Sequence, residues 1–207
     1  MDFAGALAIC DSILPSFQHP AARPWRRLCL ALAGSAETAL GNYEGALEQL
    51  VAAQDDMERQ IMIADWIWCM WLESGLTDLW LAKGDLAQAE TQAKRFLNVT
   101  LSTAERTCQA LAWEANARVA AATDLMRAKD CITAALSTME GFEVPLAAWR
   151  VHATAAELCE RMGDRDLAQH QRTLSRARIL ELAHSLIGEE TLRKTFLSAP
   201  SVRKILG

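Results

Sequence analysis

The spacing of apolar residues predicts helices along almost the whole chain. Ile61, Asp65, Trp68 and Leu72, for example, are four, three and four residues apart, which places them along one side of a helix. We expect this stripe to face the core. Nine long helical segments are predicted, over residues 2–14, 24–40, 43–57, 58–83, 86–99, 102–122, 125–139, 145–162 and 166–186. Residues 189–207 are expected to form one or two short helices broken at Ala199-Pro200.

A short turn-like segment recurs between these helices. Its copies begin at residues 1, 41, 84, 123 and 163, so successive starts are 40, 43, 39 and 40 residues apart. Gly followed by Asn or Asp, as in Gly41-Asn42, is expected to end one helix in a left-handed conformation and to cap the next. The sixth position is Ala in every copy, which lets paired helices approach closely. These residues are Ala6, Ala46, Ala89, Ala128 and Ala168.

The repeats predict an all-α protein, a right-handed α-solenoid of antiparallel helix pairs. Residues 1–188 would form one repeat domain of about four and a half repeats, with turns near 1, 41, 84, 123 and 163. Residues 189–207 would be C-terminal capping helices that cover the end of the stack. Ser102 and Glu105 have the spacing of a capping box, so we expect Ser102 to begin its helix.

The repeat pattern resembles the tetratricopeptide repeat family. The family pattern has a small residue before the turn and Gly at the turn, followed by an aromatic residue two positions later and Ala five positions later. Gly34, Gly41, Tyr43 and Ala46 match these four positions. The period near forty is longer than the usual 34 residues, and such lengthened repeats look like the C-terminal helical arms of large bacterial signalling and transcription regulators. The resemblance implies a superhelix that binds a protein or peptide in its concave groove.

Composition and charge narrow the function classes. The chain contains 37 Ala and 28 Leu but only 15 Val and Ile together, which favours helices over strands. The net charge of -5 does not favour nucleic-acid binding. Residues 160–207 are mildly basic, with nine Lys or Arg against six Asp or Glu, but the two signs are interleaved as on a solvated helix face. Nucleic-acid binding through this segment is the third hypothesis, after protein or peptide binding and small-ligand sensing.

No motif for catalysis or metal binding is present. The four histidines lack the spacing of metal ligands, and the chain has no Walker, GxGxxG or GxSxG motif. We therefore expect no enzymatic activity, no metal and no cofactor. The six cysteines are scattered without a CxxC pair and the chain begins without a signal peptide, which indicates reduced thiols in a cytoplasmic protein. The most apolar stretch, Ile61–Trp71, is too short to cross a membrane.

The tryptophans are the sequence feature that indicates a binding function in addition to a helical scaffold. Four of seven tryptophans lie in the segment 58–83, and the others lie on the first helices of the other three full repeats. First helices line the concave groove in the solenoids that this pattern resembles, so we identify Trp66, Trp113 and Trp149 as candidate partner-binding residues. Trp66 lies about 160° around the helix from Trp68, on the opposite side. Filling of the core between Ala-rich helices is the alternative role for these indoles.

The first helix has no preceding partner in the repeat order. Its apolar groups, such as Phe3, Leu7 and Ile13, would then be exposed. We expect either that the chain is the C-terminal piece of a longer protein or that a second copy covers this helix in a homodimer. The leading function is a non-catalytic scaffold for a protein, peptide or helix, and the alternative is a small-ligand sensor arm of a regulator.

Overall fold

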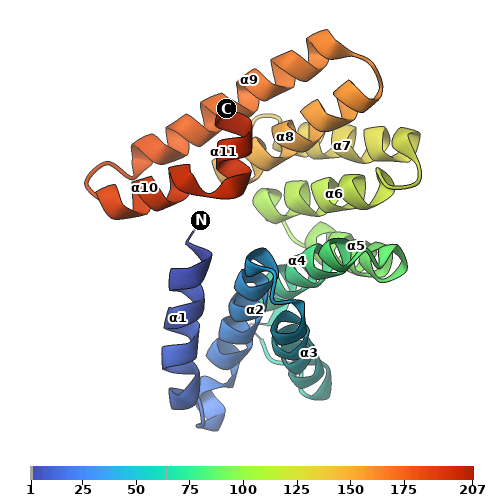
Figure 1. Cartoon of the computed structure of the whole chain (residues 1–207). Helices are drawn as coiled ribbons and strands as arrows, with labels where there is room; N and C mark the ends of the chain where they lie inside the picture. Colours follow the sequence, from blue (N-terminus) through green and yellow to red (C-terminus); the bar gives the residue numbers. More distant parts are fainter. Residues whose placement is uncertain (1, 64) are drawn as a thin grey trace. The chain divides into compact units, whose positions relative to one another are not determined.

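The computed structural model describes residues 2–63 and 65–207, and its regular structure over these residues is helical. The chain divides into two compact units, an N-terminal unit (Phe3–Ser102) and a C-terminal unit (Thr103–Gly207). The N-terminal unit contains α1 (Phe3–Ile13), α2 (Arg23–Leu40), α3 (Tyr43–Arg59), α4 (Asp65–Lys83) and α5 (Leu86–Leu101), with two short 3-10 turns, Leu14–Ser16 and Pro20–Ala22, between α1 and α2 (Figure 1). The prediction of an all-α protein is confirmed for the described residues.

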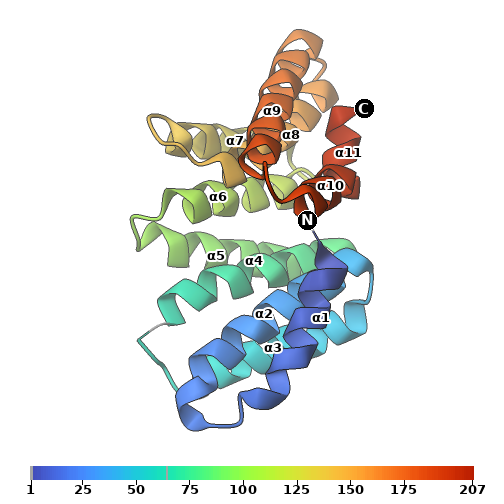
Figure 2. The same cartoon turned by 90° about the vertical axis from the view of Figure 1, so that its left-hand side faces the viewer.

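The C-terminal unit contains six helices within its described residues. They are α6 (Arg106–Ala120), α7 (Leu125–Met139), α8 (Pro145–Arg161), α9 (Arg165–Ser185), α10 (Glu190–Ser198) and α11 (Pro200–Leu206). The two short final helices were expected, and they pack on α9 (Figure 2). Val202 of α11 and Ala199 before it share a core cluster with Trp149 and Ile179, so the segment expected to cap the stack belongs to the compact C-terminal unit.

Consecutive helices pair within each unit. In the N-terminal unit α2 packs on α3 and α4 on α5, while α1 and α4 also pack on α2. In the C-terminal unit α6 packs on α7 and α8 on α9, while α6 also packs on α8 (Figure 1). The first helices of neighbouring pairs therefore lie against each other inside each unit.

The recurring turns have the predicted conformations. Gly41, Gly84 and Gly163 have φ values of 85°, 76° and 87°, in the left-handed region that a side chain would strain. The residue after each turn caps the next helix with its side chain: Asn42 accepts from the Gly45 amide, and Asp85, Asp124 and Asp164 accept from the equivalent amides. Sequence and local structure therefore agree at these hairpins.

The recurring Ala lies where paired helices touch. Ala46, Ala89, Ala128 and Ala168 are fully buried. The approach of α2 to α3 is close enough that a Cβ on Gly34 would lie 2.6 Å from the Leu50 side chain and 3.0 Å from the Ala46 carbonyl oxygen. The first copy differs because Ala6 of α1 is exposed.

The linker before α4 is the clearest departure from the predicted helices. The segment 58–83 was expected to be one helix, but α3 continues to Arg59 and α4 begins at Asp65. The buried Arg27 guanidinium explains the break. Its Nη2 donates to the carbonyl oxygens of Asp56 and Gln60 at 2.6 and 2.8 Å, its Nε to the Asp56 carboxylate at 2.7 Å, and its Nη1 to both oxygens of Asp65. Carbonyls bound by Arg27 end α3, and Asp65 is held at the start of α4.

Two smaller expectations were wrong. Ile61 is 88% exposed in the linker and does not continue the core stripe, although Asp65 and Leu72 of that stripe are buried. Ser102 does not begin a helix, because α5 ends at Leu101 and α6 begins at Arg106. Glu105 is the cap: its carboxylate accepts from the amides of Thr107 and Cys108 at 3.3 and 2.5 Å.

Candidate functional site

Two exposed indoles and one half-buried indole come from α2 and α4, which pack together in the N-terminal unit. The rings of Trp25 and Trp68 meet with their centroids 5.8 Å apart, and Trp71 follows Trp68 by one turn of α4. Trp25 is 56% exposed and Trp71 is 42% exposed. Leu32, seven residues after Trp25 and on the same side of α2, is also exposed. We call Trp25, Leu32, Trp68 and Trp71 the tryptophan surface.

The three tryptophans selected from sequence have different environments. Trp66 is 53% exposed and lies on the opposite side of α4 from Trp68, as its helical angle predicted, but it faces α3 and α5 and is not part of the tryptophan surface. Trp113 of α6 is half-buried. Trp149 is only 7% exposed and packs against Ile179, so we assign it to the core of the C-terminal unit. Trp25 and Trp71 are the exposed indoles that the selection missed.

A cleft of about 570 Å³ lies on the Trp66 side of α4, within the N-terminal unit. Its walls come from the end of α3, the linker 60–63, the first half of α4 and the end of α5. Apolar side chains line most of it, chiefly Met57, Ile61, Trp66, Leu72 and Val99. Its volume is within the range of small-molecule sites.

Glu73 brings a buried carboxylate to this cleft. Its side chain is 3% exposed, and its Oε1 lies 3.1 Å from Nε of Arg95 on α5. Within the described residues its Oε2 has no hydrogen-bond partner. Burial raises the pKa of Glu73 to about 7, and the opposing effect of Arg95 does not cancel it.

The other polar groups of the cleft are already engaged. Glu58 at the end of α3 also pairs with Arg95, at 3.3 Å, and Asp65 is held by the Arg27 guanidinium. Cys69 of α4 also lines the cleft, and burial raises the pKa of its thiol to about 11. Cys69 is therefore protonated at neutral pH and is not a nucleophilic thiolate.

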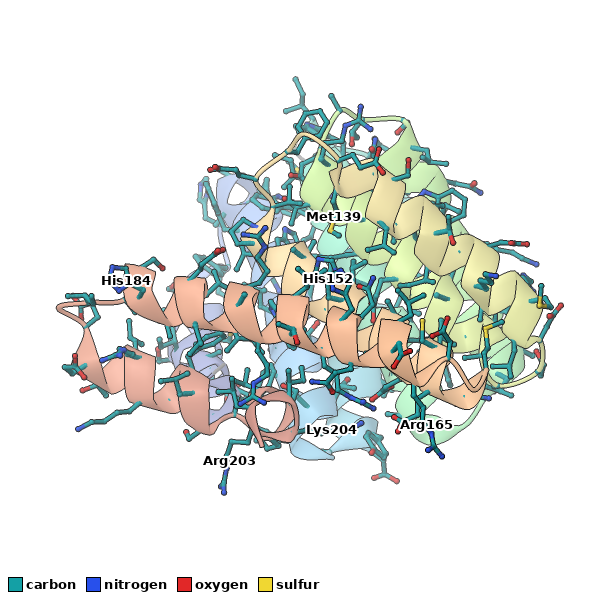
Figure 3. The ribbon with its side chains drawn as sticks, turned by 90° about the horizontal axis from the view of Figure 1, so that it is seen from above. Met139, His152, Arg165, His184, Arg203 and Lys204 are labelled. Atoms are coloured by element: carbon teal, nitrogen blue, oxygen red, sulfur yellow. The ribbon has the colours of Figure 1, made fainter. Side chains whose placement is uncertain are left out.

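A more polar groove of about 520 Å³ lies in the C-terminal unit, between α6, α8, α9 and α11. Its buried carboxylate, Glu114, is fully engaged: Thr154 donates to Oε1 at 2.7 Å, and Arg118 and Arg150 approach its two oxygens at 2.8 and 3.5 Å. Lys204 of α11, labelled in Figure 3, also lines this groove and pairs with Glu157 at 2.5 Å. Ion pairs within the protein thus satisfy the groove's main charges.

The remaining candidates for chemistry are dispersed. His152 of α8, labelled in Figure 3, contacts Gln171 at 2.7 Å, and burial lowers its pKa, which favours the neutral imidazole. In the basic C-terminal segment, Arg172 pairs with Glu160, and Arg178 with Glu181. Across residues 2–63 and 65–207, no three His, Cys, Asp or Glu side chains lie together as metal ligands would. All six cysteines are free.

None of the helices in the described part of the chain combines the length and the apolar character that a membrane crossing requires. The observed class is an all-helical protein built from paired helices. No family model and no curated protein matches the chain. Among solved structures, it resembles the crystal structure of BtubC (BKLC) from P. vanneervenii, with a TM-score of 0.66 over 99% of this chain and 87% of that chain, at 13% identity. At this identity the likeness concerns the fold alone.

Proposed function

We propose that the protein is a non-catalytic binding scaffold of the tetratricopeptide-like type, a right-handed α-solenoid that binds a peptide or a helix of a protein partner. The observation that carries this proposal is the tryptophan surface, where two adjacent first helices expose Trp25 and Trp71. The recurring glycine turns and buried Ala of the hairpins support the repeat architecture.

The energetics of indoles support binding at this surface. Trp combines a large apolar face with few rotatable bonds, and it is the residue type most enriched among those that dominate binding energy. Trp25 and Trp71 leave apolar area in water, whereas Trp149 is already buried in the C-terminal unit. A partner that covered the two exposed rings would gain the free energy of burying them.

We place this scaffold in the cytoplasm, as the C-terminal arm of a larger bacterial regulator. The repeat period and the six free cysteines support this placement. The alternative function, a small-ligand sensor arm, is favoured by a different observation: the apolar cleft beside Trp66 and Glu73.

Peptide display tests the proposed function directly. A random peptide library would be selected on the purified chain and the winning peptides titrated against it and against Trp25→Ala. We expect apolar or aromatic peptides with Kd values of roughly 10 μM, and a weakening of about 30-fold in Trp25→Ala, which corresponds to about 2 kcal/mol. Trp66→Ala, an equally exposed indole on the other side of α4, is the matched control and should bind normally. A selection without specific binders would refute the proposal.

We also propose that the protein self-associates through α1. Leu7 of α1 packs with Cys10 against α2, but Ile9 and Ile13 remain exposed together with Ala6. Phe3 is half-buried. Covering the exposed side of α1 by a second copy would remove apolar surface from water.

A further inference from the structure

The Glu73 side of α4 presents a hydrogen-bonding group that the protein leaves unused. A buried carboxylate oxygen without a partner is costly, because desolvation removes the water that would otherwise bind it. Glu114 in the C-terminal unit shows the usual solution, since Thr154, Arg118 and Arg150 surround its two oxygens. Among residues 2–63 and 65–207, Glu73 has only Arg95 as a partner, on one oxygen. Because Glu73 lines the cleft, a donor that enters the cleft can satisfy this oxygen.

The charge around the cleft indicates what kind of donor would bind. The charged residues that line it are Glu58, Asp65, Glu73 and Arg95, three acids against one base. Asp65 and the neighbouring Asp56 are balanced by Arg27 and Arg23, whereas Glu58 and Glu73 share the single Arg95. The cleft therefore carries more negative than positive charge and favours a cation over a neutral or anionic ligand.

The rest of the lining fits an apolar body attached to that cation. Ile61 and the half-buried Val99 offer aliphatic surface, and the half-exposed indole of Trp66 offers an aromatic face. Indole faces attract organic cations through the ring quadrupole. A strongly hydrated inorganic ion would gain little from these groups, whereas an amine with a hydrocarbon tail would gain from both.

We propose that the cleft bounded by α3, α4 and α5 is a binding site for a small apolar amine, with the ammonium group donating to the Glu73 carboxylate and the hydrocarbon part lying against Ile61, Val99 and Trp66. This site is on the opposite side of α4 from the tryptophan surface and does not depend on peptide binding there.

Three ligands of similar size test the site on the unmodified chain: phenethylamine, 2-phenylethanol and phenylacetate, titrated by ligand-detected NMR at pH 8. We expect phenethylamine to bind with a Kd of roughly 1 mM and at least tenfold more tightly than the other two. Equal affinities for the three compounds, or no saturable binding of phenethylamine up to about 20 mM, would overturn the proposal.

Variants then locate the bound amine. Glu73→Gln keeps the side-chain shape and should weaken phenethylamine at least tenfold, whereas Glu48→Gln, an exposed position of α3 outside the cleft, should not change it. Trp66→Leu should weaken binding severalfold, which provides a second test if Glu73→Gln fails to fold. Unchanged affinity in folded Glu73→Gln or in Trp66→Leu would contradict the site. Trp25→Ala should leave phenethylamine binding intact, so this result is separable from the peptide experiment.

Discussion

The buried carboxylate of Glu73 makes a quantitative prediction about stability. Burial raises its pKa from the ordinary 4.5 to about 7 in the folded chain. The folded state therefore favours the protonated acid, and the stability that this provides is present below about pH 4.5 and is lost as the pH rises through 7. At about 1.4 kcal/mol per pKa unit, ionisation of Glu73 lowers the free energy of unfolding by about 3 kcal/mol at pH 8.5 and by less than about 1 kcal/mol at pH 5.

Glu73→Gln isolates this effect because glutamine resembles the protonated acid in shape and charge. The free energy of unfolding of the variant minus that of the natural chain should be about 2.5 kcal/mol larger at pH 8.5 than at pH 5. Urea unfolding at both pH values, followed by circular dichroism, measures the difference. Glu48→Gln is the control, since an exposed carboxylate should change stability by no more than about 0.5 kcal/mol at either pH. A stability difference between Glu73→Gln and the natural chain that is the same at both pH values would refute the reasoning.

Three further predictions concern other parts of the molecule. Arg27→Met should lower the free energy of unfolding by about 3–5 kcal/mol in urea, because it removes the guanidinium that two buried aspartates share and leaves Asp65 without its ion-pair partner, whereas Arg26→Met should cost far less; equal losses would contradict the role of Arg27. Phenethylamine affinity should rise about tenfold from pH 6 to pH 8 as Glu73 ionises, and a flat profile in NMR titrations would argue against contact with this carboxylate. Ile9→Glu should shift sedimentation towards the monomer at high protein concentration; if the natural chain is already monomeric there, α1 is not a self-association surface.

The hairpins could be predicted from sequence because their signals are local. A glycine at a left-handed position, a cap residue after it and an Ala four residues later are readable without knowledge of the fold, and Gly41, Asn42 and Ala46 adopt the expected roles. The linker before α4 could not be predicted in this way. It depends on Arg27, which lies 29 residues from Asp56 and 38 from Asp65 in the sequence. Local helical spacing carries no information about ion pairs between residues so far apart.

The candidate sites were only partly predictable. The abundance of Trp on first helices was visible, and the opposite orientations of Trp66 and Trp68 followed from their spacing. The sequence could not separate the exposed Trp25, Trp66 and Trp71 from the buried Trp149, because exposure depends on which neighbouring helix covers each side. The seven-residue spacing of Trp25 and Leu32 was the available signal for the tryptophan surface. Glu73 gave no signal, because an acid within a helix is usually solvated and its burial arises from α3 and α5.

The most direct test of the proposed scaffold is the NMR spectrum of its indole N–H groups, assigned by single Trp→Phe variants and recorded with a peptide obtained from the display selection. Binding at the tryptophan surface predicts that the signals of Trp25, Trp68 and Trp71 shift on addition of peptide while that of Trp149 stays in place. Shifts confined to Trp66 or Trp113, or an unchanged spectrum at saturating peptide, would contradict the account.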